Sequence, residues 1–166
     1  MTTRAVVLAD THLRAGGPGR LPEAAFRLLD DADVILHAGD LIDASVLETL
    51  EAIAPTYAVL GNNDRSLTER LPATQLLEFE GVRIAMIHDS GSAAARPVRM
   101  RRRFPDVHVV VFGHSHIPLD IEGVDGQRLF NPGSPTQRRA QPHRTAGVLE
   151  FADGALRSSR IVVLDD

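Results

Sequence analysis

The first half of the chain alternates short apolar runs with segments whose apolar residues recur at helical spacing. In the second of these helical segments, Asp43 or Ser45 can cap the start, and Pro55 ends it. The predicted elements are strands over 4–10, 33–40 and 56–64 and helices over 22–32 and 43–55. This strand-helix alternation predicts a parallel sheet covered by helices.

The second half of the chain instead pairs strands through short turns. Turn signals at Glu80-Gly81, Asp125-Gly126 and Asp153-Gly154 each predict a hairpin. The predicted elements are a strand pair over 75–89, a short helix over 93–103, a strand over 106–116, a hairpin over 117–134 and a C-terminal hairpin. We therefore expect one α/β domain over 1–166, with a second sheet that is mostly antiparallel.

Composition narrows the function classes. The chain has 166 residues, of which 43% are hydrophobic, as in an ordinary globular domain. With no cysteine, disulfides and thiolate metal sites are excluded. A net charge of -4 and only 4% aromatic residues argue against nucleic acid as a stable partner. The apolar runs are too short to cross a membrane and no signal-peptide pattern is present, so we expect a cytoplasmic protein, with homo-oligomer formation left open.

Polar side chains collect just after the apolar runs. Ligands bind in open α/β sheets at the carboxyl ends of the strands, so these side chains should share one rim. His114 and His116 stand two apart after a valine run, and a strand would point both to one side. The predicted rim set is Asp10, His12, Asp40, Asn62, His88, His114 and His116. This mixture of carboxylate and imidazole suits two first-row divalent ions that share one carboxylate, a known device for phosphoester hydrolysis.

The ordered series D-x-H, GD, GN, H and GHxH resembles the calcineurin-like metallophosphoesterase superfamily. The short length, the Asn-Pro-Gly-Ser stretch at 131–134 and the terminal hairpin resemble its small bacterial and archaeal phosphodiesterase branch. The resemblance covers Ala5 to Val163. It implies a four-layer α/β/β/α sandwich of two mixed sheets flanked by helices. It also implies two divalent transition-metal ions, with Mn favoured over Fe, Ni or Zn.

The resemblance also assigns roles to the rim residues. It implies that Asp40 bridges both ions and that a water or hydroxide between them attacks phosphorus in line. One ion would be held by Asp10, His12 and His116, and the other by Asn62, His88 and His114. We therefore expect hydrolysis of phosphodiester bonds in a small substrate. A phosphomonoesterase and a non-catalytic binding module of the same fold are the alternatives.

The sequence departs from the family pattern at two positions. Asn63 stands where the family often has a histidine, and an amide can donate a hydrogen bond but cannot act as an acid. Asp89 follows His88, where glycine is common. We take Asp40 and Asn63 as the catalytic candidates and Asn63 and Arg65 as candidate substrate contacts, and we expect a preference for good leaving groups.

Several further residues have two interpretations. His37 is a partner of a metal-binding side chain or, as we favour, a buried histidine bonded to backbone. Asp64 is expected to brace its turn rather than bind metal. The arginine-rich run over 96–103 is expected to be the solvated face of a surface helix, with an anionic partner surface as the alternative. Arg138 and Arg139 lie near the expected rim, where an arginine could bind a phosphate.

Overall fold

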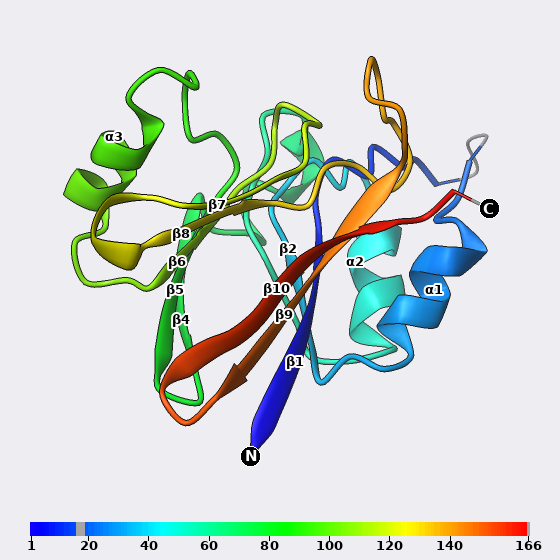
Figure 1. Ribbon diagram of the computed structural model, residues 1–166. Coiled ribbons are helices and arrows are strands. Elements are labelled where there is room, and N and C mark those ends of the chain that lie inside the picture. Colours follow the sequence, from blue (N-terminus) through cyan, green and yellow to red (C-terminus); the bar gives the residue numbers. More distant parts are fainter. Residues whose placement is uncertain (16–18, 166) are drawn as a thin grey trace.

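A computed structural model describes residues 1–15 and 19–165 and contains two five-stranded sheets (Figure 1). The described helices are α1 (Glu23–Leu29), α2 (Ala44–Glu51) and α3 (Arg96–Arg103), with 3₁₀ turns at Arg65–Leu67 and Val124–Gly126. The described strands are β1 (Thr2–Leu8), β2 (Val34–His37), β3 (Thr56–Ala58), β4 (Thr74–Phe79), β5 (Val82–Ile87), β6 (Val109–Val111), β7 (Leu119–Glu122), β8 (Arg128–Asn131), β9 (Thr145–Ala152) and β10 (Ala155–Val163).

The first sheet has the strand order β10-β9-β1-β2-β3. Its β1-β2 and β2-β3 pairs are parallel, as the alternating first half of the sequence predicts. The terminal hairpin β9-β10 joins the open edge of β1 in antiparallel register. Asp43 caps α2 by accepting the N–H of Ser45 at 2.9 Å, which selects between the two predicted caps.

The second sheet has the order β4-β5-β6-β8-β7 and is mixed rather than mostly antiparallel, so that expectation is wrong. The β4-β5 and β7-β8 hairpins are antiparallel, whereas β5-β6 and β6-β8 are parallel. The reason is connectivity: α3 carries the chain from β5 across to β6, and the terminal hairpin belongs to the other sheet. The predicted turns at Glu80-Gly81, Asp125-Gly126 and Asp153-Gly154 are confirmed.

The two sheets and the helices on their outer faces form four layers, with an apolar core between each neighbouring pair of layers. Alternate residues of β1 face opposite ways: Val7 enters the core between the two sheets, whereas Val6 and Leu8 enter the core beneath α1 and α2. A third core lies between the second sheet and α3, where Met100 and Phe104 pack. Both faces of β1 are thus covered from Ala5 onward, which explains the uninterrupted apolar run over 5–9. The result is the α/β/β/α sandwich, with α1 and α2 on one side and α3 on the other (Figure 1).

Among the described residues, no helix has the length and apolar character that crossing a bilayer requires.

Candidate metal centre

The candidate ligands lie in the loops that follow the strands, not on the strands themselves. β1 ends at Leu8, two residues before Asp10, and β6 ends at Val111, three residues before His114. His114 and His116 have φ values of 72° and 61°, in the left-handed region, so the expectation that strand alternation orients them is wrong. The backbone turns at once after each strand. The same left-handed conformation recurs at Asp10, His12 and Asp40.

Left-handed backbone at non-glycine residues is uncommon and clusters at functional sites. Neighbouring glycines supply the room that these turns need. A Cβ atom added at Gly61 would overlap the Asp40 carboxylate, and one at Gly39 would lie 2.6 Å from His88 Nδ1. One at Gly113 would lie 3.0 Å from Asp10 Oδ2. A side chain at any of these three positions would therefore collide with the cluster, so glycine is required for the backbone to pass this close to it.

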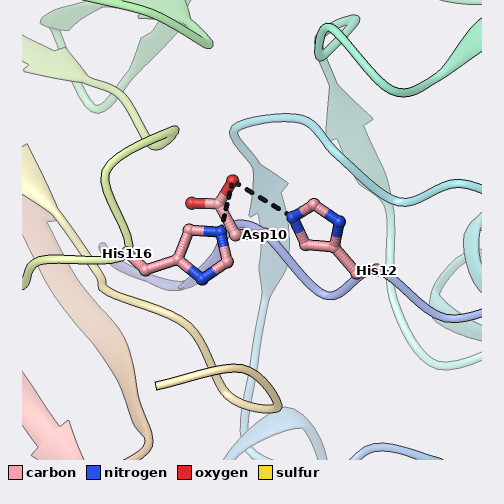
Figure 2. Close-up of side chains that lie close together, drawn as sticks. All are labelled: Asp10, His12 and His116. Carbon is pink, nitrogen blue, oxygen red and sulfur yellow. Dashed lines mark ion pairs between the residues drawn. The ribbon is translucent and has the colours of Figure 1, made fainter. Parts of the chain in front are cut away.

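The first cluster consists of Asp10, His12 and His116 (Figure 2). Asp10 Oδ1 lies 3.7 Å from His116 Nε2 and 3.9 Å from His12 Nε2. Asp10 and His116 are buried, and His12 is partly exposed. Both rings turn an Nε2 atom toward the same carboxylate oxygen, which is the convergence that one shared cation requires.

The second cluster forms around the amide oxygen of Asn62. Asn62 Oδ1 lies 3.0 Å from His88 Nε2 and 3.2 Å from His114 Nδ1. His88 is buried in the rim and His114 is exposed at its outer edge. The structure therefore brings together the three donors that were predicted to share the second ion.

The carboxylate of Asp40 lies between the two clusters. Its Oδ2 atom is 3.3 Å from His12 Nε2 and 3.5 Å from His88 Nε2, one residue of each cluster. Asp10 also stands between them, because its Oδ1 lies 3.9 Å from His88 Nε2. Two carboxylates are therefore in reach of both clusters, and the bridging role of Asp40 stays a prediction.

Unpartnered buried atoms indicate that this donor set fits a metal. Both carboxylate oxygens of Asp10 and the Nε2 atoms of His12 and His116 are buried without a hydrogen-bond partner. Leaving such atoms unpaired costs on the order of 1–3 kcal/mol each. The Nδ1 atoms of His88 and His116 face the carbonyl oxygens of Ala38 at 2.7 Å and Gln137 at 2.5 Å. These contacts place the protons on Nδ1 and leave each Nε2 lone pair toward the cluster, as metal-binding histidines require.

The pKa directions reflect two carboxylates facing each other in a buried place. Burial raises the pKa of Asp10 to about 7, with His88 opposing the shift and Asp40 reinforcing it. Burial alone would raise the pKa of Asp40, but hydrogen bonds with His88 and Asn63 outweigh it and hold that pKa below its usual range. Burial also lowers the pKa of His12 and His116, which favours neutral rings. For His88, burial alone would lower the pKa, but its contacts with Asp40 and the Ala38 carbonyl outweigh burial and raise it. Neutral His12 and His116 rings beside two carboxylates form a site that attracts cations.

Two buried groups brace the ligand loops. Asp64 Oδ2 accepts the N–H groups of Asp40 and Gly61, both at 2.8 Å, and its Oδ1 accepts the N–H of Ile42 at 2.7 Å. It braces its own turn, as predicted, and also fixes the loop after β2. His37 is a buried histidine bonded to backbone, which is the interpretation that we favoured. Its Nδ1 accepts the N–H of Gly39 at 3.1 Å, and its Nε2 lies 3.2 Å from Thr11 Oγ1.

A loop over 131–137 supports the centre, a role that was not predicted for it. Ser134 Oγ donates to the Asp10 carbonyl at 2.8 Å, and Thr136 Oγ1 donates to the Thr11 carbonyl at 2.7 Å. Asn131 donates its amide to the Gly113 carbonyl at 3.1 Å. The Asn-Pro-Gly-Ser stretch at 131–134 was used only as part of the family resemblance. Its amide and hydroxyl side chains, which readily hydrogen-bond to backbone, were the sequence signal for this supporting role.

The candidate substrate contacts lie beside the first cluster. Asn63 donates its backbone N–H to Asp40 Oδ1 and its amide to Asp40 Oδ2, both at 2.9 Å. Asn63 and Arg65 line an open cleft of about 420 Å³ that reaches His12. Asp89 Oδ2 lies 3.8 Å from His114 Nε2, at the other end of the site.

Not every arginine of the run and the rim behaves as expected. Arg99 donates to the carbonyl groups of Ser90, Ser92 and Ala94, so it holds the loop before α3 instead of facing solvent. The solvated-face expectation fits exposed Arg102. Arg139 is close enough to influence Asp10, His12 and His116 electrostatically, whereas Arg138 donates to the Gln141 carbonyl.

Most of the chain matches a known protein family. Residues 4–154 match the model of the calcineurin-like phosphoesterase superfamily domain. A protein of Methanothermobacter thermautotrophicus, named "Probable metallophosphoesterase", is 36% identical over 137 residues, which span 80% of this chain and 77% of that protein. A Methanocaldococcus jannaschii protein with a similar name is 36% identical over 139 residues, which span 80% and 68%.

Solved structures share the fold over nearly the whole chain. A solution NMR structure of a Thermotoga maritima protein is 30% identical, with a TM-score of 0.72 and coverage of 98% of this chain and 99% of the other. A crystal structure of Entamoeba histolytica Vps29 complexed with zinc has a TM-score of 0.76 at 21% identity, covering 98% and 100%. At that identity, the likeness to Vps29 concerns the fold alone.

Proposed function

Because this chain belongs to the calcineurin-like phosphoesterase superfamily, we propose that it is a hydrolase of phosphodiesters that uses two divalent metal ions. The observation that carries the proposal is the set of buried donor atoms without partners at Asp10, His12 and His116. Such atoms are costly unless a cation pairs with them. The preference for diesters over monoesters follows from the sequence resemblance to the small phosphodiesterase branch.

The residues divide into two sets of ligands and one shared carboxylate. Asp40 is proposed to serve both ions, the first set is Asp10, His12 and His116, and the second set is Asn62, His88 and His114. When bound, such ions lower the pKa of a water molecule and neutralise charge that develops on the phosphate. Manganese is the ion that the family resemblance favours, and the carboxylate and amide oxygen donors of the site suit it.

The protein groups around the ligands orient the substrate and the rings. His88 and His116 are fixed by Nδ1–H bonds to backbone carbonyls, so each presents Nε2 inward. The amide of Asn63 donates to Asp40, and its position on the cleft allows it to donate to a phosphate oxygen instead. Asn63 cannot protonate the leaving group, so good leaving groups should be preferred.

The alternative is a non-catalytic binding module of the same fold. The fold likeness to Vps29 motivates it, and one of those proteins was crystallised with zinc. Metal binding alone therefore does not distinguish the two functions, whereas turnover does. All seven predicted donors are present in this chain, which favours the enzyme.

The test measures metal content and turnover together. Purified protein is stripped with a chelator and then reloaded separately with Mn, Fe, Ni or Zn. Hydrolysis of bis(4-nitrophenyl) phosphate should vanish on stripping, return on reloading, and exceed hydrolysis of 4-nitrophenyl phosphate. An Asp40→Asn variant purified in the same way controls for contaminating phosphatases. Two bound ions without turnover of any ester would overturn the enzyme proposal in favour of the binding module.

A further inference from the structure

The open cleft of about 420 Å³ beside His12 carries two arginines. Its described lining is His12, Arg14, Ile42, Asn63, Arg65 and Gln137, and none of these is acidic. His12 belongs to the first cluster of candidate ligands, so the cleft opens directly onto the candidate metal centre. A substrate held at the centre would extend one of its arms into this space.

The two arginines of the cleft lack the acidic partners that several other arginines have. Arg4, Arg70, Arg128, Arg144 and Arg157 each form an ion pair with an acidic side chain. Within the described part of the chain, neither the Arg14 nor the Arg65 guanidinium has an ion-pair or hydrogen-bond partner. In a protein of net charge -4, two unpaired cations in one cleft without a lining carboxylate favour an anionic ligand there.

The cleft also has one apolar lining residue, Ile42, whose backbone is fixed. Ile42 has a φ of 82°, an outlier for a β-branched residue. Its N–H donates to the buried Asp64 carboxylate at 2.7 Å, which holds the backbone in this conformation. Strained backbone that the surroundings hold in place occurs at ligand sites. The cleft thus offers one apolar side chain for the uncharged part of a substrate arm and two cations for an anionic group.

The charge of the scissile group does not account for both arginines. A phosphodiester carries one negative charge, and the proposed metal centre would neutralise it. Two further guanidinium groups suit a second anion, because each can donate paired N–H bonds to phosphate or carboxylate oxygens.

We propose that the preferred substrate is a phosphodiester with a second anionic group on one arm, bound by Arg14 and Arg65. This inference rests on the proposed function and names the class of substrate. Hydrolysis proceeds as for any diester: water adds to phosphorus, the bond to the leaving oxygen breaks, and a monoester and an alcohol or phenol result.

A matched pair of substrates tests the proposal. The 4-nitrophenyl ester of thymidine 5′-phosphate and the same ester bearing a 3′-phosphate differ only in the second anion. We expect kcat/KM to be at least about tenfold higher for the doubly charged ester, the size of one charge-assisted bond. Arg14→Ala and Arg65→Ala should each bring that ratio toward one, and Arg14→Lys should restore part of it. Arg160→Ala, which removes an exposed arginine of β10, should keep the ratio. A ratio near one in the unmodified protein overturns the inference.

A binding measurement separates this inference from the proposed function. Calorimetry on chelator-stripped protein compares thymidine 3′,5′-bisphosphate with thymidine 5′-phosphate, since neither compound requires turnover. The bisphosphate should bind about tenfold more tightly, and the Arg14→Ala and Arg65→Ala variants should lose this difference. If neither ester is hydrolysed, the proposed function fails, and the calorimetry alone tests the anion site. Tighter binding of the bisphosphate would support that site, and equal binding of the two compounds would overturn it.

Discussion

The Asp64 carboxylate accepts the backbone N–H of Asp40 at 2.8 Å, so the turn after β3 fixes the loop after β2. Asp64 also accepts from Gly61 and Ile42, and its exposed fraction is 1%. Asp64, which is not itself a candidate ligand, therefore fixes the position of Asp40 between the two ligand clusters.

Replacing Asp64 with Asn should destabilise the protein by about 2–3 kcal/mol, because an amide cannot accept all three N–H groups and the charge that strengthens them is lost. Metal content should fall as well, since Asp40 is no longer fixed. Urea denaturation and metal analysis measure the two effects. Asp43→Asn is the matched control: at this helix cap, Asn and Asp are about equivalent, so the free energy of unfolding should stay close to that of the unmodified protein. Equal effects of the two variants would contradict the bracing role.

Replacing Asp40 and replacing His116 should reduce the number of bound metal ions by different amounts. Asp40 is in reach of both clusters, so Asp40→Ala should lose both ions or all turnover. His116 lies only in the first cluster, and His116→Ala should retain one ion. Elemental analysis of the purified variants gives the stoichiometry. Two ions per chain and near-normal turnover in Asp40→Ala would show that Asp40 is not the bridge, and Asp10, the other carboxylate between the clusters, would take that role.

Asn63 should limit the enzyme to good leaving groups, because an alkyl alcohol needs an acid to depart and an aryl group does not. We expect turnover to fall steeply as the pKa of the leaving group rises across phenyl and alkyl diesters. Asn63→His should flatten this dependence, with gains of about 10²–10⁴-fold at the alkyl end. A shallow dependence in the unmodified protein would indicate that another group protonates the leaving oxygen, with Asp89 the first residue to test.

His37 should make the metal-free protein sensitive to acid. Burial lowers the pKa of this ring to about 3, below its unfolded value of 6.5, so the unfolded chain binds the proton first. The stability is present above pH 6.5 and declines as pH falls toward 3, by about 1.4 kcal/mol per pH unit. At pH 5, the free energy of unfolding should have dropped by about 2 kcal/mol from this residue.

His37→Asn removes the titrating ring while keeping an acceptor for the Gly39 N–H. Urea unfolding at pH 8 and pH 5, with chelator present, should show a smaller pH difference for this variant than for the unmodified protein. A variant of exposed His143 should keep the full difference. An unchanged difference in His37→Asn would mean that other groups cause the acid sensitivity.

Most elements could be predicted from the sequence, because periodicity records burial directly. The apolar run of β1 reads as a strand covered on both faces, and the turn at Glu80-Gly81 reads as a hairpin. The partner of the terminal hairpin could not be read in this way. Whether β9 pairs with β1 or with the second sheet depends on which edge is open, and that is a property of the assembled fold.

The identity of the candidate ligands was also accessible from the sequence, whereas their geometry was not. Spacing of two after a strand suggested a shared direction for His114 and His116, but left-handed backbone at both residues sets their orientation. The bonds from Ser134 to the Asp10 carbonyl and from Asn131 to the Gly113 carbonyl connect distant segments. Such contacts leave no local periodic signal, so the loop over 131–137 had to be found in three dimensions.

The candidate donors come from both sheets, and this has a consequence for assembly. Asp10, His12, Asp40 and Asn62 follow strands of the first sheet, whereas His88, His114 and His116 follow strands of the second. Each sheet alone carries an incomplete set. Ions bound to the full set would join the sheets at the rim, so their binding energy would add to the cohesion of the interface. If the chain is divided into two fragments between Asp64 and Thr74, the fragments should therefore associate more tightly when metal is present. Such a fragment pair would report the presence of metal through its association.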